Sequence, residues 1–249
     1  MTSLWLVLKK SYLVGWVTLT TFYGFLAVYF NLWTKPREIA DAANRGLTMW
    51  WGKRLMNGLG VQITTQGAPI SKEATLFVGN HMSYIDIPVF YTLRNATFVA
   101  KKEVASWPIF GPATSSVGTI FVERESIKSR VATTDAMRAA ILDRKQSIVI
   151  FPEGTSSVAG KTWRAGALRM AADADLVVQP FVIYYRPTRI ASYIDDDNFV
   201  KHLWQWVASH RIEATIHFFE PRKVTDAHES TREIQELVQS KWREIDARN

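Results

Sequence analysis

The chain contains no cysteine among its 249 residues. A disulfide, a thiolate–metal site and a cysteine nucleophile are therefore excluded. The sequence also lacks the G-x-S-x-G elbow that carries the serine of many hydrolases and the H-E-x-x-H motif of zinc hydrolases, and its five histidines are scattered. Neither an activated protein serine nor a metal centre is indicated, and we see no internal repeat or low-complexity tract.

Positive charge is unevenly distributed along the chain. Residues 1–60 hold seven basic and two acidic side chains, so five of the seven net positive charges lie there. A basic chain could bind nucleic acid, but no recognised nucleic-acid module is present and the charge flanks an apolar segment. We therefore expect a bilayer with anionic lipids as the partner, at about 1 kcal/mol per basic residue near the surface, and no nucleic acid.

Residues 11–34 carry no charged side chain and are rich in aromatic residues. As one helix this segment would be about 36 Å long, enough to cross a bilayer. Its aromatic content and the lack of a small-residue cleavage site argue against a signal peptide. A buried helix and a re-entrant hairpin, which Gly15 and Gly24 would permit, remain alternatives.

Residues 39–59 mix Met, Trp and Leu with Arg and Lys. The pattern is typical of an amphipathic helix in the membrane interface, and equally of a helix that packs on a core. We therefore predict a membrane-associating segment at residues 1–60 and a catalytic domain at residues 61–249.

Beyond residue 60, strand and helix patterns alternate. We expect helices at 85–93, 127–143, 166–174 and near the C-terminus, and strands at 61–65, 75–78, 97–100, 118–122, 147–151, 177–185 and 213–219. This order predicts an α/β domain with a mixed central sheet flanked by helices, preceded by a hydrophobic helical anchor.

Two polar clusters follow buried strands, at residues 80–86 and 151–155. Polar groups at strand ends are the usual way to assemble an α/β site. In the first cluster His81 and Asp86 could not meet if both were inside a helix, because five residues rotate a side chain by about 500°. We expect His81 in the loop, Asp86 in the first turn, and Ser83 as the N-cap of a capping box.

Two interpretations of this pair are open at this point. Asp86 could merely cap the helix beside an ordinary loop histidine. Alternatively, Asp86 orients His81, and His81 acts as a general base on a substrate hydroxyl.

Four segments in order resemble the motifs of the glycerolipid acyltransferases, which include the 1-acylglycerol-3-phosphate and other lysophospholipid acyltransferases. Asn80 to Asp86 resembles the first, N-H-x4-D. Gly118 to Arg124, with Phe121, resembles the second, G-x-I-F-x-x-R. Phe151-Pro152-Glu153-Gly154-Thr155 resembles the third, and the apolar strand around Pro180 the fourth. The resemblance covers about residues 61–220.

The resemblance implies acyl transfer from an acyl carrier protein or coenzyme A thioester to a lysolipid hydroxyl, most simply 1-acyl-sn-glycerol-3-phosphate, with no tightly bound cofactor. His81 would be the base and Asp86 its orienter. The implied substrate-binding residues are Asn80, Ser83, Gly118, Phe121, Arg124, Glu153, Gly154, Thr155 and Pro180. A bacterial inner membrane with the catalytic domain on its cytoplasmic face is the implied location. Backbone N–H groups near Ser83 are plausible oxyanion donors.

One position departs from the family pattern. Many phosphatidate-forming members have Arg after the third motif, where this chain has Ser156. Loss of such a contact to phosphate would cost about 1.5–3 kcal/mol, unless Lys161 or Arg164 compensates. Relatives that acylate lyso-ornithine lipids or other lysophospholipids often have Ser or Thr there, so such an acceptor is an alternative, as is a lysolipid-binding protein without catalysis.

Overall fold

The computed structural model describes residues 3–106, 111, 114–115, 117–123, 125–158, 160–194, 197–208 and 212–248. Its centre is an eight-stranded sheet in the order β1-β7-β6-β2-β5-β3-β4, with β8 paired to β6. The strands are β1 Val61–Gly67, β2 Leu76–Gly79, β3 Thr97–Lys101, β4 Ile120–Val122, β5 Ile148–Ile150, β6 Val177–Arg186, β7 Ile212–Phe218 and β8 Arg222–Lys223. β7 and β8 run antiparallel to β6, whereas β2 is parallel to both β5 and β6. The predicted mixed α/β sheet is confirmed.

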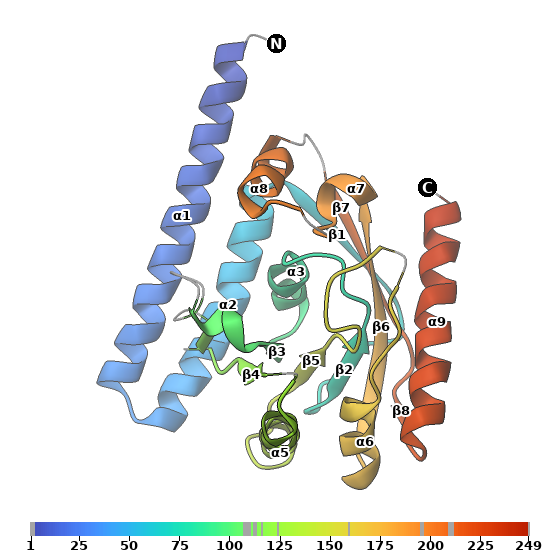
Figure 1. Cartoon of the computed structure of the whole chain (residues 1–249). Coiled ribbons are helices and arrows are strands. Elements are labelled where there is room, and N and C mark those ends of the chain that lie inside the picture. The colour runs from blue at the N-terminus through green and yellow to red at the C-terminus, as the bar shows by residue number, and fades with distance from the viewer. Residues whose placement is uncertain are drawn as a thin grey trace.

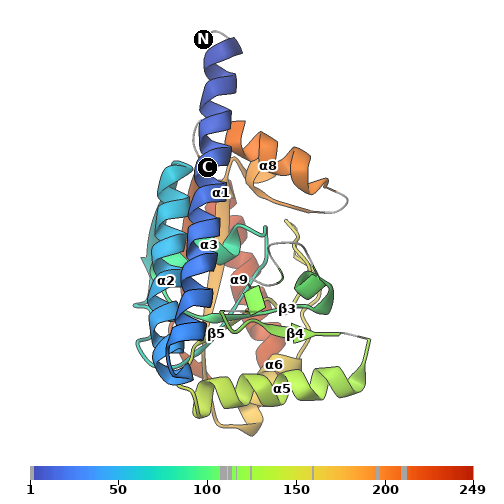
Figure 2. The same cartoon turned by 90° about the vertical axis from the view of Figure 1, so that its left-hand side faces the viewer.

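Helices cover both faces of the sheet (Figures 1 and 2). On one side lie α1 Ser3–Thr34, α2 Arg37–Gly58 and α3 Asp86–Leu93. On the other lie α5 Ile127–Leu142, α6 Gly166–Asp173 and α9 Ala227–Ala247. The short helices η1 Lys102–Ser106, α7 Thr188–Ala191 and α8 Phe199–Ala208 were not predicted. The apolar core is accordingly split into two clusters, one on each face of the sheet.

The first two helices form a hairpin along one flank of the molecule (Figure 1). α1 is continuous, and its residues Ser11–Thr34 are long and apolar enough to cross a membrane. Only 22% of that candidate span is buried, so the described residues do not form a buried core helix, and the predicted re-entrant alternative is not seen. α2 lies between α1 and α3 and places Leu55 and Met56 in the core, so it packs as a domain helix.

The central strands β2, β5 and β6 place the two polar clusters at one edge of the sheet. β2 is buried along its whole length between β5 and β6. It ends at Gly79, where a Cβ atom would lie 2.6 Å from the carbonyl oxygen of Phe181, so the backbones approach more closely than a side chain permits. The chain then leaves the sheet at Asn80, directly beside the point where it leaves β5.

Pro180 lies inside β6, in register with Val78 of β2. A proline within a strand can mark an edge strand or a bulge, and β6 is not an edge strand because it lies between β7 and β2. Its carbonyl oxygen accepts the N–H of Phe219 at 2.9 Å, but it has no N–H to return. The side-chain amide of Gln179 instead donates to the Phe219 carbonyl at 3.1 Å, which satisfies the acceptor that the proline leaves.

Candidate active site

The two polar clusters meet at the carboxyl edge of the sheet, as expected. β2 and β5 are parallel neighbours, so the segments that follow them emerge side by side. The N–H of Ser157, in the loop after β5, donates to the His81 carbonyl at 2.7 Å. The phenyl ring of Phe151 stacks on the His81 imidazole with ring centroids 4.2 Å apart and an interplanar angle of 9°. The loop after β5 therefore fixes both the backbone and the ring of His81.

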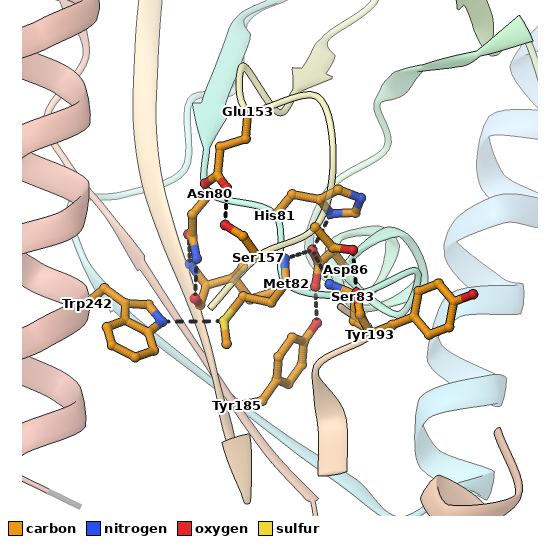
Figure 3. Close-up of polar contacts among 12 residues, drawn as sticks. Asn80, His81, Met82, Ser83, Asp86, Glu153, Ser157, Tyr185, Tyr193 and Trp242 are labelled. Carbon is orange, nitrogen blue, oxygen red and sulfur yellow. Dashed lines mark hydrogen bonds and ion pairs between the residues drawn. The ribbon is translucent and has the colours of Figure 1, made fainter. Parts of the chain in front are cut away.

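His81 and Asp86 form the predicted pair (Figure 3). The Nδ1 atom of His81 lies 2.7 Å from Oδ2 of Asp86, and the two side chains are 21% and 1% exposed. Since the carboxylate can only accept here, Nδ1 carries the proton and Nε2 presents its lone pair. No group among the described residues bonds to Nε2. One nitrogen is thus held and the other is available to a substrate.

Asp86 is buried, but its carboxylate is well bonded. Oδ2 accepts from the His81 ring and from the backbone N–H groups of Met82 at 2.8 Å and Ser83 at 3.1 Å. Oδ1 accepts from the hydroxyl of Tyr185 at 2.7 Å. Such bonds offset the cost of burying a charge, and they leave the carboxylate one orientation. Asp86 therefore holds the His81 ring and the loop that precedes the helix, and its carboxylate does not cap the helix.

The expectation that Ser83 is the N-cap of the helix is wrong. The helix begins at Asp86 with Ile85 in the cap position, and the Asp86 N–H donates to the Ser83 carbonyl at 3.0 Å, not to its hydroxyl. The fully buried Ser83 hydroxyl has no partner within the described part of the chain. The N–H groups of Met82 and Ser83 are also not free to act as oxyanion donors, because Asp86 accepts from both.

Asn80 lies at the site, where its side chain bonds to the backbone of β6. Its side-chain amide donates to the Ile183 carbonyl at 2.9 Å and accepts the Ile183 N–H at 2.8 Å. This pair of bonds extends the β2–β6 pairing by a side chain after the strand has ended. It fixes the start of the loop that carries His81, which is a role the sequence did not reveal.

The third motif forms the loop above His81. Glu153 is 6% exposed and accepts from the hydroxyl of Ser157 and, at 3.3 Å, from the N–H of Lys161. Burial raises the pKa of Glu153, while these bonds and the nearby His81 oppose the rise. Gly154 has a φ of +76°, which the turn requires. Thr155 is half-buried next to it.

Gly118 does not lie beside His81. Gly118 precedes β4, level with Thr97 in the register that pairs Val99 with Ile120. This is also the level of Leu76 in β2, so at about 3.3 Å per residue and about 4.8 Å per strand Gly118 lies about 10 Å along the strands and about 14 Å across them from Gly79, where β2 ends. Phe121 is half-buried within β4. Arg124 lies outside the described residues.

Sequence reasoning did not predict several hydrogen bonds that hold the site. The hydroxyl of Ser156 donates to the Tyr193 carbonyl, and the Tyr193 N–H donates to the Met82 carbonyl at 2.9 Å. The Tyr84 hydroxyl contacts Nδ1 of His202 at 2.9 Å, and Nε2 of His202 lies 2.9 Å from the Ser192 carbonyl. These segments are far apart in sequence, and no local pattern predicts that they bond to one another.

Comparison with known proteins agrees with this geometry. The acyltransferase family model matches residues 61–184. The lyso-ornithine lipid O-acyltransferase of Pseudomonas aeruginosa is 32% identical over 96% of this chain and 93% of that protein. The chain belongs to the acyltransferase family. The 1-acyl-sn-glycerol-3-phosphate acyltransferase of Helicobacter pylori is 30% identical over 63% of the chain and 65% of that protein.

The acyltransferase fold extends to the N-terminal hairpin. The crystal structure of the 1-acyl-sn-glycerophosphate acyltransferase PlsC from Thermotoga maritima matches with a TM-score of 0.77. The match covers 99% of this chain and 98% of that one at 18% identity, so it bears on the fold alone. This acyltransferase is therefore an enzyme of lipid metabolism, and its apolar N-terminal helix is a candidate membrane anchor.

Proposed function

We propose that this acyltransferase moves a fatty acyl group from a thioester to the free hydroxyl of a lysolipid, with His81 as general base and Asp86 as its orienter. The observation that carries the proposal is the His81 ring, held at Nδ1 by a buried carboxylate with Nε2 available. Nε2 takes the hydroxyl proton as the oxygen attacks the thioester carbonyl. Asp86 stabilises the imidazolium, the C–S bond breaks, and the proton passes to the leaving thiolate. The reaction needs neither a metal nor a bound cofactor.

The acceptor that the motifs predict is 1-acyl-sn-glycerol-3-phosphate, which would give phosphatidate for phospholipid biosynthesis. The name of the Helicobacter pylori relative supports this acceptor. In this proposal Glu153, Gly154 and Thr155 shape the acceptor pocket, and Arg124 holds the phosphate through its planar fork. The roles of Gly118, Phe121 and Pro180 in acceptor binding stay predictions.

A specific observation favours lyso-ornithine lipid as a second candidate acceptor. Ser156 stands where an arginine would be expected, and its hydroxyl is engaged by the Tyr193 carbonyl. The position therefore contributes a bond between loops and no cation. The Pseudomonas aeruginosa and Rhizobium meliloti relatives named lyso-ornithine lipid O-acyltransferases match 96% and 94% of the chain.

The α1 helix supports placement at a membrane. Its outward side chains form an apolar stripe that includes Leu19, Phe22, Leu26, Phe30 and Trp33, all more than 50% exposed apart from Leu26 at 50%. Such a stripe is stable only against lipid or another apolar surface. We place this stripe in the bacterial inner membrane, with the domain on the cytoplasmic face, where anionic lipids and an acyl carrier protein or coenzyme A thioester are available.

The test is an acyl-transfer assay with detergent-purified protein and labelled acyl thioesters. The acceptors are lysophosphatidate, lysophosphatidylethanolamine, lysophosphatidylglycerol and lyso-ornithine lipid. His81→Ala should abolish transfer while far-ultraviolet circular dichroism is unchanged. His228→Ala, an exposed histidine on α9, is the matched control and should keep full activity.

The acceptor that the wild type uses decides between the two candidates. Transfer to lysophosphatidate would show that Ser156 costs little, and transfer to lyso-ornithine lipid alone would identify the second acceptor. Lysolipid binding without transfer, equal in wild type and His81→Ala, would overturn the enzymatic proposal in favour of a binding protein.

A further inference from the structure

The two oxygen atoms of Asp86 have different partners. Oδ2 accepts hydrogen bonds from the His81 ring and from two backbone N–H groups. Among the described residues Oδ1 accepts a hydrogen bond only from the hydroxyl of Tyr185, at 2.7 Å. One phenol thus closes the hydrogen-bonding shell of the carboxylate on the side turned away from His81 (Figure 3).

Tyr185 is buried in the core, where Asp86 is the one partner of its hydroxyl among the described residues. It lies in β6 and is 0% exposed, packed in the same apolar cluster as Phe77, Phe90 and Phe181. Burial, followed by the charge of Asp86 and their hydrogen bond, raises the pKa of Tyr185 well above its ordinary value. The phenol therefore stays protonated and always donates to the carboxylate.

We propose that Tyr185 is a positioning residue of the active site, which acts on His81 through Asp86. The hydroxyl holds Oδ1, so the carboxylate cannot rotate and Oδ2 stays directed at Nδ1 of His81. It also draws negative charge toward Oδ1 and so limits how strongly Asp86 favours the protonated imidazole. Tyr185 does not touch the reacting atoms. The inference rests on the proposed role of His81 as the base.

The neighbouring residue provides a matched control. Successive residues of a strand point to opposite faces, and Tyr184 donates to Oδ1 of Asp246 at 2.9 Å on the α9 side of the sheet. Tyr184→Phe and Tyr185→Phe each remove one phenol–carboxylate bond, and Tyr184→Phe also removes the acceptor of the Thr188 hydroxyl at 3.2 Å. Only the second change reaches the catalytic pair.

The sign of the expected effect follows from the charges that face His81. These are Asp86 from α3 and Glu153 from the loop after β5. Without the phenol, Asp86 carries more negative charge toward the ring and stabilises its protonated form. In Tyr185→Phe the acidic limb of the kcat/KM profile should therefore move to higher pH. The kcat value should fall about tenfold with KM within about twofold, since the base is less well held.

The experiment compares wild type, Tyr184→Phe and Tyr185→Phe, using whichever lysolipid the wild type acylates. In parallel, the His81 ring nitrogens are titrated by ¹⁵N nuclear magnetic resonance, with His81→Ala to assign the signals. The ring should titrate at higher pH in Tyr185→Phe and unchanged in Tyr184→Phe. The spectroscopic result does not need turnover, so an inactive wild type would overturn the proposed function and still test the role of Tyr185.

A substitution of opposite sign guards against a fold defect. 3-Fluorotyrosine at position 185 keeps the ring and is a stronger donor, so the ring titration and the acidic limb should move to lower pH. Shifts of opposite sign in the two variants would establish the positioning role. An unchanged titration in both variants, or equal losses of kcat in Tyr184→Phe and Tyr185→Phe, would overturn it.

Discussion

The two ends of the parallel strands are built differently. At the carboxyl ends of β2 and β5, His81, Asp86 and Asn80 are bonded to groups from other segments, and most of these groups are buried. At the amino ends of β3 and β5, a cavity of about 570 Å³ is lined by Gly118 and by basic residues that include Arg45, Arg94, Arg144 and Lys145.

This difference separates two kinds of site. Buried groups that bond to one another hold a side chain in one orientation, which is what general-base catalysis requires. A cavity lined by basic side chains attracts anions. Gly118, the first residue of the second motif, lies at this cavity and not beside His81.

The largest effect should come from Asp86→Asn. The side-chain NH₂ group of the asparagine cannot accept the hydrogen bonds that the carboxylate oxygen accepts now. The His81 ring would therefore lose the acceptor that fixes its tautomer and its orientation. We expect kcat to fall on the order of 10⁴-fold, as for other aspartate–histidine pairs. Asp246→Asn makes the same change to the partner of Tyr184 on the α9 side and should leave kcat within about twofold. A fall in kcat of less than about tenfold in Asp86→Asn would contradict the claim that the bonded groups at the carboxyl ends of β2 and β5 hold His81 for catalysis.

A smaller effect is expected from Asn80→Ala. The substitution leaves the N–H and carbonyl of Ile183 without the partners that they have now. The free energy of unfolding should fall by about 2 kcal/mol, and kcat by about tenfold as the His81 loop loosens. Urea denaturation and the acyl-transfer assay measure the two quantities. Asn57→Ala, at an exposed position of α2, should change neither; a stable, fully active Asn80→Ala protein would contradict the assigned role.

Low pH should reduce the stability of the folded protein through protonation of His202. Burial lowers the pKa of this histidine, so the folded state binds its proton less readily than the unfolded chain. Stability is therefore lost as pH falls below the ordinary histidine value of about 6.5. Protonation also turns Nδ1 into a donor, which removes the acceptor for the Tyr84 hydroxyl.

Thermal unfolding of wild type and His202→Gln from pH 8 to pH 5 measures this contribution. His217, whose pKa burial also lowers, contributes in the same direction, so the variant should keep part of the pH dependence. An identical slope in both proteins would show that His202 does not contribute.

The smallest effect on turnover is expected from Gly118→Ala. The nearest atom to an added Cβ is the Thr97 hydroxyl at 3.9 Å, so space is sufficient, but φ is +84°. The cost should be about 1 kcal/mol of stability from the backbone, with kcat within about twofold. If the KM for the acceptor rose more than about tenfold, the acceptor would reach this end of the sheet, and the predicted binding role of Gly118 would be supported.

The sequence by itself determined most of the helices and strands and the pairing of His81 with Asp86. Alternation of apolar runs located the strands, and the spacing of His81 and Asp86 required a loop followed by a first helical turn, which is the geometry found. Local patterns suffice here because helix and strand periodicity and short-range bonds depend on neighbours in the chain.

Only the tertiary structure decided which residues support the pair. Tyr185 and Ile183 in β6, Phe151 and Ser157 after β5, and Tyr193 reach the His81 loop because β5, β2 and β6 are adjacent in the sheet. The same strand order places Gly118 at the opposite edge, although its motif suggested the site. Strand order is set by packing between segments that are distant in sequence, and no local pattern encodes it.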